Sequence, residues 1–92
     1  MTIYRRLHLE ARDPARNCFR LWQLDAQTDL FGRHLVQITY GRIGGNGRTI
    51  SRSFTQIHEA ERYIRIAIAR RRSSPRRIGI PYRVLIDEKW PI

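Results

Sequence analysis

The sequence predicts an α+β fold, in which a small antiparallel β-sheet of four to five strands, in the order β-β-β-β-α-β, has one helix packed across it. Alternation of apolar and polar residues predicts the strands, and a glycine-rich turn between two such segments predicts a hairpin. Apolar residues at helical spacing in the second half of the chain predict the helix. Since 92 residues are one domain's length, we expect a single domain over residues 1–92.

The first two strands are predicted near the N-terminus. Apolar residues alternate in part along residues 3–9, which indicates a strand. Residues 13–17 (DPARN) are typical of a turn. Residues 18–24 (CFRLWQL) predict a second strand with both faces covered at one end. Residues 25–32 are expected to form a polar connection.

A β-hairpin is predicted in the middle of the chain. Residues 34–43 alternate regularly, and residues 44–47 (GGNG) accept the positive φ angles of a tight turn. Beyond the turn, Ile50, Arg52 and Phe54 share one strand face.

A helix and a final strand complete the chain. Thr55 is the expected N-cap, and residues 73–75 (SSP) end the helix because a residue before proline avoids the helical region. Residues 82–86 predict a short last strand. The helix has one apolar stripe, made of Ile57, Ala60, Tyr63, Ile64, Ala67 and Ile68.

Charge is the strongest functional signal. The chain has 18 Lys and Arg against 8 Asp and Glu, a formal net charge of +10, and every basic residue except Lys89 is arginine. Guanidinium groups match phosphate with two parallel hydrogen bonds, so this excess favours a nucleic-acid partner. The arginines also cluster around the hairpin and after the helix. The candidate phosphate contacts are Arg42, Arg48, Arg52, Arg70, Arg71, Arg72, Arg76 and Arg77.

Several other function classes are disfavoured. We find no nucleophile elbow, paired carboxylates or phosphate-binding glycine fingerprint, so we expect no enzyme, no catalytic residue and no cofactor. The three histidines and Cys18 lack metal-ligand spacing, so no metal site is expected. A lone cysteine excludes an internal disulfide, and no apolar run fits a signal peptide or membrane span. We therefore expect a cytoplasmic protein with no membrane partner, a monomer rather than an oligomer.

Residues 40–44 (YGRIG), followed by Asn46 and Gly47, resemble the signature of the WGR domain, which is named for a Trp-Gly-Arg tripeptide. Residues 17–19 (NCF) look like the family's early Asn-x-Phe strand, and Phe54 and Ala60 fit its later pattern. The resemblance spans residues 3–82, although Gly79 and Tyr82 are separated where the family often has an adjacent Gly-Tyr pair.

This resemblance implies a compact domain that binds DNA, as in DNA-dependent poly(ADP-ribose) polymerases, where such domains engage strand breaks. No catalytic domain accompanies it, so we expect no poly(ADP-ribose) synthesis. Tyr40 stands at the family's Trp, and the resemblance implies that it stacks on a nucleotide with a smaller ring. Strict alternation places Tyr40 and Arg42 on the face of Val36 and Ile38, so we expect a bulge or twist near Gly41 to turn both outward; otherwise Tyr40 is a core aromatic.

The sequence is therefore compatible with two functions from different classes. The first is a non-catalytic module that binds DNA, and in particular strand ends or breaks, through phosphate contacts with little sequence specificity; RNA is a close variant. The alternative is an adaptor that docks on an acidic protein partner.

Overall fold

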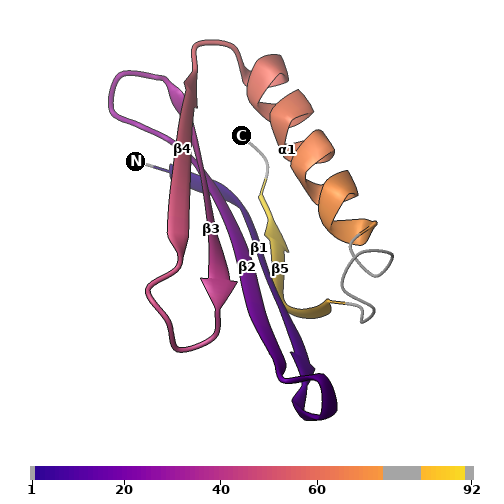
Figure 1. Ribbon diagram of the computed structural model, residues 1–92. Coiled ribbons are helices and arrows are strands. Elements are labelled where there is room, and N and C mark those ends of the chain that lie inside the picture. The colour runs from indigo at the N-terminus through magenta and orange to yellow at the C-terminus, as the bar shows by residue number, and fades with distance from the viewer. Residues whose placement is uncertain (1, 74–81, 91–92) are drawn as a thin grey trace.

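A computed structural model of the chain describes residues 2–73 and 82–90 (Figure 1). Its elements confirm the predicted α+β class and the order β-β-β-β-α-β. They are β1 (Thr2–Asp13), the short 3₁₀ helix η1 (Pro14–Arg16), β2 (Cys18–Thr28), β3 (His34–Arg42), β4 (Arg48–Phe54), α1 (Ile57–Arg72) and β5 (Arg83–Lys89).

The five strands form one antiparallel sheet in the order β4-β3-β2-β1-β5. Consecutive strands from β1 to β4 are neighbours, whereas the chain returns through α1 to place β5 beside β1. The helix lies along one face of this sheet (Figure 1). Trp22, Leu24, Val36 and Ile38 of the sheet and Ala60 and Ile64 of the helix are among the buried core residues. The fold therefore has two layers with the core between them.

The other face of the sheet is open and polar, which explains two wrong boundaries in the sequence prediction. The first strand extends to Asp13 instead of Leu9, and β2 continues to Thr28 through residues predicted as a connection. Asp25 and Gln27 alternate with the fully buried Ala26 and lie on the open face. Polar residues at every second position belong to a half-buried strand, and here they were interpreted as loop.

The ends of the last two elements also differ from the prediction. Gln56, in extended conformation, occupies the N-cap of α1, and its side chain makes no capping hydrogen bond. The prediction of Thr55 as N-cap is therefore wrong by one residue. The last strand, β5, runs to Lys89 and not to Ile86. The helix ends at Arg72, as its proline-containing border predicts.

The hairpin between β3 and β4 forms where predicted. Gly44 and Gly47 have φ angles of 82° and 65°, in the left-handed region that glycine favours. A Cβ atom added to Gly41 would lie 2.7 Å from the Cα of Gly47, so the base of the hairpin closes only because Gly41 lacks a side chain. The pairing of β2 with β3 continues without a shift through Tyr40, Gly41 and Arg42, so the expected bulge near Gly41 is absent.

Candidate nucleic-acid interface

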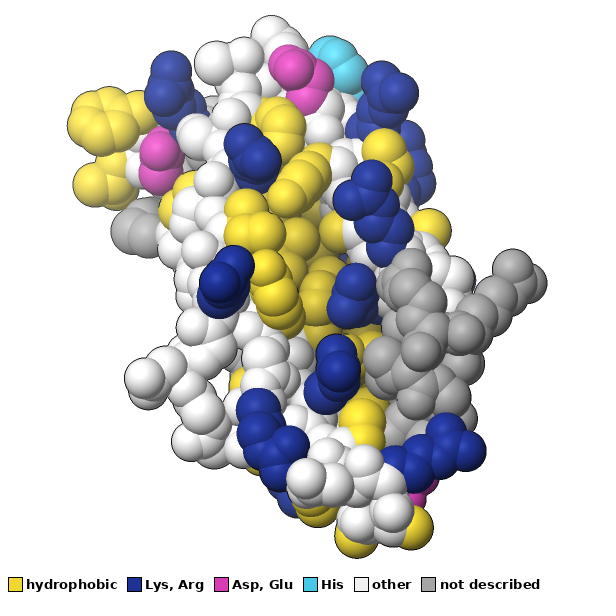
Figure 2. Space-filling view, in the orientation of Figure 1, with side chains coloured by type: hydrophobic (Ala, Val, Ile, Leu, Met, Phe, Trp, Pro, Cys, Tyr) yellow, Lys and Arg dark blue, Asp and Glu magenta, His cyan; other side chains and the backbone are white. Residues whose placement is uncertain are grey.

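A hydrophobic furrow runs between the β3–β4 hairpin and α1, with basic side chains along both sides (Figure 2). We call it the sheet–helix groove. It is an open hollow of about 600 Å³. Its lining residues are Arg20, Trp22, Ile38, Tyr40, Ile50, Tyr63, Ile66, Ala67, Arg70 and Arg71. The groove exists because α1 covers only part of the sheet face, which leaves Ile50 and Ile66 38% and 46% exposed.

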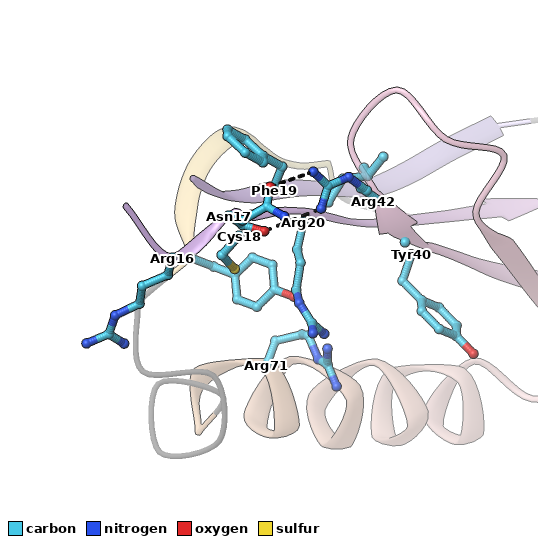
Figure 3. A pocket seen from close by; sticks show the side chains of 11 residues that line it. Arg16, Asn17, Cys18, Phe19, Arg20, Tyr40, Arg42 and Arg71 are labelled. Atoms are coloured by element: carbon cyan, nitrogen blue, oxygen red, sulfur yellow. Dashed lines mark hydrogen bonds between the residues drawn. The ribbon is translucent and has the colours of Figure 1, made fainter. Parts of the chain in front are cut away.

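A second hollow of about 580 Å³ continues from the groove toward the turn between β1 and β2, and we call it the turn hollow. It shares three lining residues with the groove, namely Arg20, Tyr40 and Arg71. Figure 3 shows the side chains of Arg20 from β2 and Arg71 from α1 reaching into the space between sheet and helix. These three side chains lie where the two hollows meet.

Tyr40 remains on the core face of the sheet. It pairs with Trp22 on β2 and Arg48 on β4, and its half-buried ring packs at the edge of the core. The ring points toward α1 (Figure 3). The expectation that Tyr40 turns away from this face is therefore wrong, because nothing interrupts the alternation of β3. Its ring is nonetheless accessible from both hollows, since it lines each of them.

Arg42 contacts the turn between β1 and β2. Its Nη2 donates a hydrogen bond to Oδ1 of Asn17 at 3.0 Å, and its Nη1 donates to the Asn17 carbonyl at 3.4 Å. Its guanidinium carbon lies 5.3 Å from the centroid of the Phe19 ring, a cation–π distance. The two short motifs of the sequence, NCF and YGR, thus contact each other through this side chain (Figure 3).

Arg48 and Arg52 lie on β4 at the border of the groove. Their Cα partners on β3 are Tyr40 and Val36, so both residues share the sheet face that α1 packs on. Both are exposed, and Ile50 lies between them on the same face. The structure therefore places Arg48 beside Tyr40 and Arg52 farther along the same face, beside Val36.

The predicted cluster after the helix is divided. Arg70 and Arg71 line the groove, whereas Arg72 lines only another hollow of about 240 Å³ near β1 and β5, which Arg71 also lines. Successive residues of a helix point in directions about 100° apart, which separates Arg72 from Arg70. Arg76 and Arg77 lie outside the described residues.

Arg20 is a site residue that the sequence prediction missed. It is exposed, it lines both hollows, and its Cα partner on β3 is Arg42. Arg20 lies two residues before the buried Trp22, so the two side chains share the core face of the strand. The alternation of the sequence could therefore have identified Arg20. It was overlooked because a single arginine in an apolar strand looks like a surface residue.

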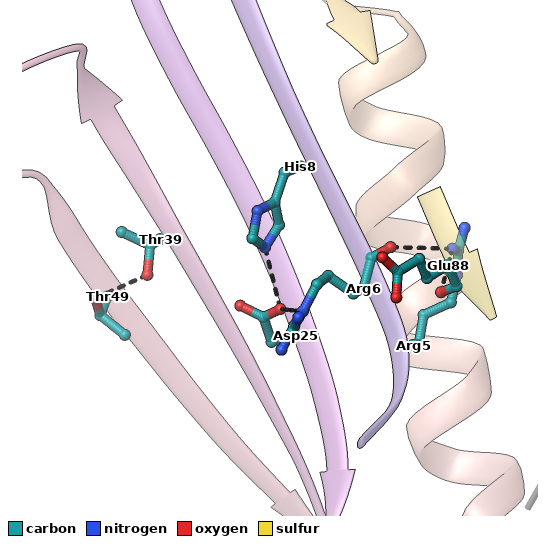
Figure 4. A network of polar contacts seen from close by, with 7 residues as sticks. All are labelled: Arg5, Arg6, His8, Asp25, Thr39, Thr49 and Glu88. Carbon is teal, nitrogen blue, oxygen red and sulfur yellow. Dashed lines mark hydrogen bonds and ion pairs between the residues drawn. The ribbon is translucent and has the colours of Figure 1, made fainter. Parts of the chain in front are cut away.

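No described residue that lines either hollow is acidic, although Arg16 of the turn hollow pairs with a carboxylate just outside the lining. On the open face, Oδ1 of Asp25 lies 3.1 Å from both Nε of Arg6 and Nε2 of His8 (Figure 4). Near the turn hollow, Asp13 pairs with Arg16 at 3.5 Å. The carboxylates of these ion pairs therefore lie outside the described lining of both hollows.

Glu10 pairs with two arginines outside the groove. Its Oε1 accepts hydrogen bonds from Nε of Arg12 at 3.1 Å and from Nη2 of Arg83 at 2.7 Å. The hydrogen bond from Arg12, together with the one from Arg83, outweighs burial and holds the pKa of Glu10 below its ordinary value. Glu10 is thus a carboxylate that joins β1 to β5.

Two further observations concern other kinds of site. Within residues 2–73 and 82–90, no group of His, Cys, Asp and Glu side chains is placed to hold a metal ion. No helix in the described part of the chain is long and apolar enough to span a bilayer.

Comparison with protein families settles the relationship that the hairpin motif indicated. The family model described as the WGR domain matches residues 5–74. The chain belongs to the WGR domain family. An uncharacterized protein, y4dW of Sinorhizobium fredii (strain NBRC 101917 / NGR234), is 33% identical to this WGR domain over 86 residues. The match covers 94% of this chain but 41% of the relative, so the chain spans about two fifths of the relative's length. No solved structure matches the chain significantly.

Family membership supports a general role as a nucleic-acid-binding module. WGR domains are non-catalytic binding domains in poly(ADP-ribose) polymerases, which agrees with the expectation of a binding module and not an enzyme.

Proposed function

We propose that this WGR domain binds DNA along the sheet–helix groove, with a preference for strand ends and breaks and with little sequence specificity. One observation carries the proposal: arginines from β2, β4 and α1 surround an aromatic floor that has no acidic residue among its described lining. Several guanidinium groups on one side of the molecule attract a phosphate backbone.

The arrangement of the arginines suits a phosphate backbone and not a base edge. Arg48 and Arg52 are four residues apart on β4, with Ile50 between them on the same face, so both project from the same side of the strand. Arg20 and Arg71 approach from the opposite side of Tyr40. A strand lying along the groove would meet guanidinium groups on both sides, which fixes its position without reading its sequence.

The preference for ends follows from the depth of Tyr40. Its ring is half-buried at the junction of the two hollows, so the stacked bases inside a continuous duplex cannot reach it. A terminal or nicked nucleotide can leave the stack at low cost and place a base or sugar on the ring. Phosphate at the terminus adds charge next to Arg20 and Arg71.

Fluorescence anisotropy tests this proposal with four labelled duplexes, which have a 5′-phosphorylated end, a 5′-hydroxyl end, a nick, or closed hairpin ends. We expect the phosphorylated end and the nick to bind most tightly. Tyr40→Leu keeps apolar packing but removes the ring, and we expect roughly tenfold weaker binding to these two duplexes, the magnitude of one stacked base.

Two further variants are compared, and each removes one positive charge from a different face of the sheet. Arg20→Gln weakens binding to all four duplexes, whereas Arg12→Gln on the open face leaves it unchanged. Equal binding to all four duplexes would contradict the preference for ends. No binding to DNA, with binding to RNA or to an acidic protein, would contradict the proposed function.

A further inference from the structure

The turn between β2 and β3 displays two large apolar side chains to solvent. Leu30 and Phe31 are 82% and 89% exposed, more than any other large hydrophobic residue among the described ones. We call residues 29–33 (DLFGR) the apolar tip. The turn projects from one corner of the sheet in Figure 1, and Figure 2 shows hydrophobic side chains protruding at that corner beside a basic one.

Hydrogen bonds hold the apolar tip in a defined turn. Oδ1 of Asp29 accepts hydrogen bonds from the backbone N–H of Phe31 at 2.8 Å and of Arg33 at 2.9 Å. The backbone N–H of Asp29 donates to the Arg33 carbonyl at 2.9 Å, and Gly32 adopts a φ of 78°. Side-chain carboxylates that bind backbone N–H groups in this way fix a turn. The two apolar side chains are therefore held outward at one position.

The surroundings of the tip determine which partner fits it. Asp29 supplies the turn's carboxylate, and its Oδ1 already binds two backbone N–H groups. Arg33, two residues after Phe31, is exposed. The whole chain carries a net charge of +10, which opposes docking on a second copy of itself. A partner of this surface must carry negative charge and must also offer apolar surface to Leu30 and Phe31. A DNA duplex does both, because its stacked bases can separate and expose apolar surface.

We propose that the apolar tip is a wedge that enters a base step of DNA bound along the sheet–helix groove. This inference rests on the proposed function and adds a second point of contact. Phe31 inserts between adjacent bases, Leu30 fills the space beside it, and Arg33 contacts a flanking phosphate. Apolar wedges of this kind unstack a step and bend the duplex, and the unstacking cost is offset by contact with more protein surface.

The test uses duplexes with a 5′-phosphorylated end in which 2-aminopurine replaces adenine at successive positions, one position in each duplex. This base fluoresces more strongly when it leaves the stack. We expect the wild-type chain to raise the fluorescence roughly twofold or more at one or two adjacent positions. Leu30→Ala/Phe31→Ala abolishes this rise while anisotropy still detects binding, weakened by no more than roughly tenfold, because the phosphate contacts remain.

Val84→Ala/Leu85→Ala is the matched control. It removes the same kind of side chains from β5, where they are 56% and 51% exposed, and it should leave the fluorescence rise intact. Wild-type binding without a rise at any position overturns the wedge and leaves the proposed function standing. A rise that survives in Leu30→Ala/Phe31→Ala also overturns it and assigns the unstacking to the groove. Absence of DNA binding by the wild-type chain overturns both.

Discussion

The side chain of Arg42 connects two hairpins of the sheet. It lies on β3, yet its hydrogen bonds and its ring contact are with Asn17 and Phe19 at the turn between β1 and β2. The backbone follows the same path, since the N–H of Ile43 donates to the Phe19 carbonyl at 2.9 Å. The predicted phosphate contact at this position thus also has a structural role, which sequence patterns could not show because it depends on the β2–β3 register.

Arg42→Ala should lower the free energy of unfolding by about 1 kcal/mol, because it removes two hydrogen bonds and a cation–π contact at an exposed site. Urea denaturation measures this change. Arg48→Ala, on the exposed edge strand, should change stability by less than about 0.5 kcal/mol. Equal stability losses in the two variants would contradict the structural role of Arg42.

Gly41 is required by the close approach of the two hairpin strands. Gly41→Ala would place a methyl group 2.7 Å from the Gly47 Cα, so the backbone must shift, at a cost of about 2 kcal/mol. Gly44→Ala meets nothing within 4 Å and bears only the cost of a positive φ, about 1 kcal/mol. The melting temperature of Gly41→Ala should therefore be lower than that of Gly44→Ala. The reverse order would show that the hairpin tolerates a side chain at its base better than one in its turn.

Among the elements, the helix has an N-terminus without a side-chain cap. Gln56 is in the extended conformation that an N-cap residue adopts, but its side chain makes no capping hydrogen bond. Gln56→Asp should raise the free energy of unfolding by about 0.5–1 kcal/mol, since aspartate accepts a hydrogen bond from the first helical turn. Thr55→Ala, which alters the residue that the sequence nominated, should leave stability nearly unchanged in the same urea titration. A larger loss for Thr55→Ala would restore Thr55 as the cap.

The junction of β1 and β5 responds to acid. Because the pKa of Glu10 is lowered in the folded state, its contribution to stability is full above its ordinary pKa of 4.5 and is lost as the pH falls below it. Glu10→Gln should therefore be less stable than wild type at neutral pH and should lose less stability between neutral pH and pH 3. Circular dichroism melts at both pH values check this. If the two proteins lose the same stability between neutral pH and pH 3, Glu10 does not cause the loss of stability in acid.

The sequence predicted the kinds of elements better than their ends. Alternation found β3, which has one buried and one open face, and it found the exposed edge strand β4 and the hairpin between them. It shortened β1 and β2 because acidic and amide residues such as Glu10, Asp25 and Gln27 occupy the open face, where their polarity resembles that of a loop. Among the candidate site residues, Tyr40, Arg48 and Arg52 lie on the strands that were predicted for them, whereas Arg20 was missed although alternation places it on the face of Trp22.

For the whole molecule, the decisive property is how charge is divided between the two faces of the sheet. Arg6 and Arg12 have carboxylate partners on the open face, and Arg83 on β5 shares the Glu10 partner, whereas the groove has no acidic residue among its described lining. The carboxylates that pair with Arg6 and Arg12 thus lie on the open face of the sheet, outside the lining of the groove. We expect this asymmetry to direct a polyanion toward the groove.

Salt dependence measures this asymmetry. The slope of the logarithm of the DNA binding constant against the logarithm of salt concentration should become shallower by about 0.9 for Arg20→Gln and for Arg48→Gln, one phosphate contact each. Arg12→Gln should leave the slope unchanged. If all three substitutions change the slope equally, the binding is a diffuse effect of net charge and not of the groove.

The location of the bound DNA tests the central claim most directly. Amide chemical-shift changes in the nitrogen-15-labelled chain, recorded as a 5′-phosphorylated duplex is added, report which residues contact it. We predict the largest changes along the groove, at Tyr40, Arg48, Tyr63 and Arg70, and little change at His8 and Asp25 on the open face. Changes confined to the open face, with none along the groove, would contradict the account.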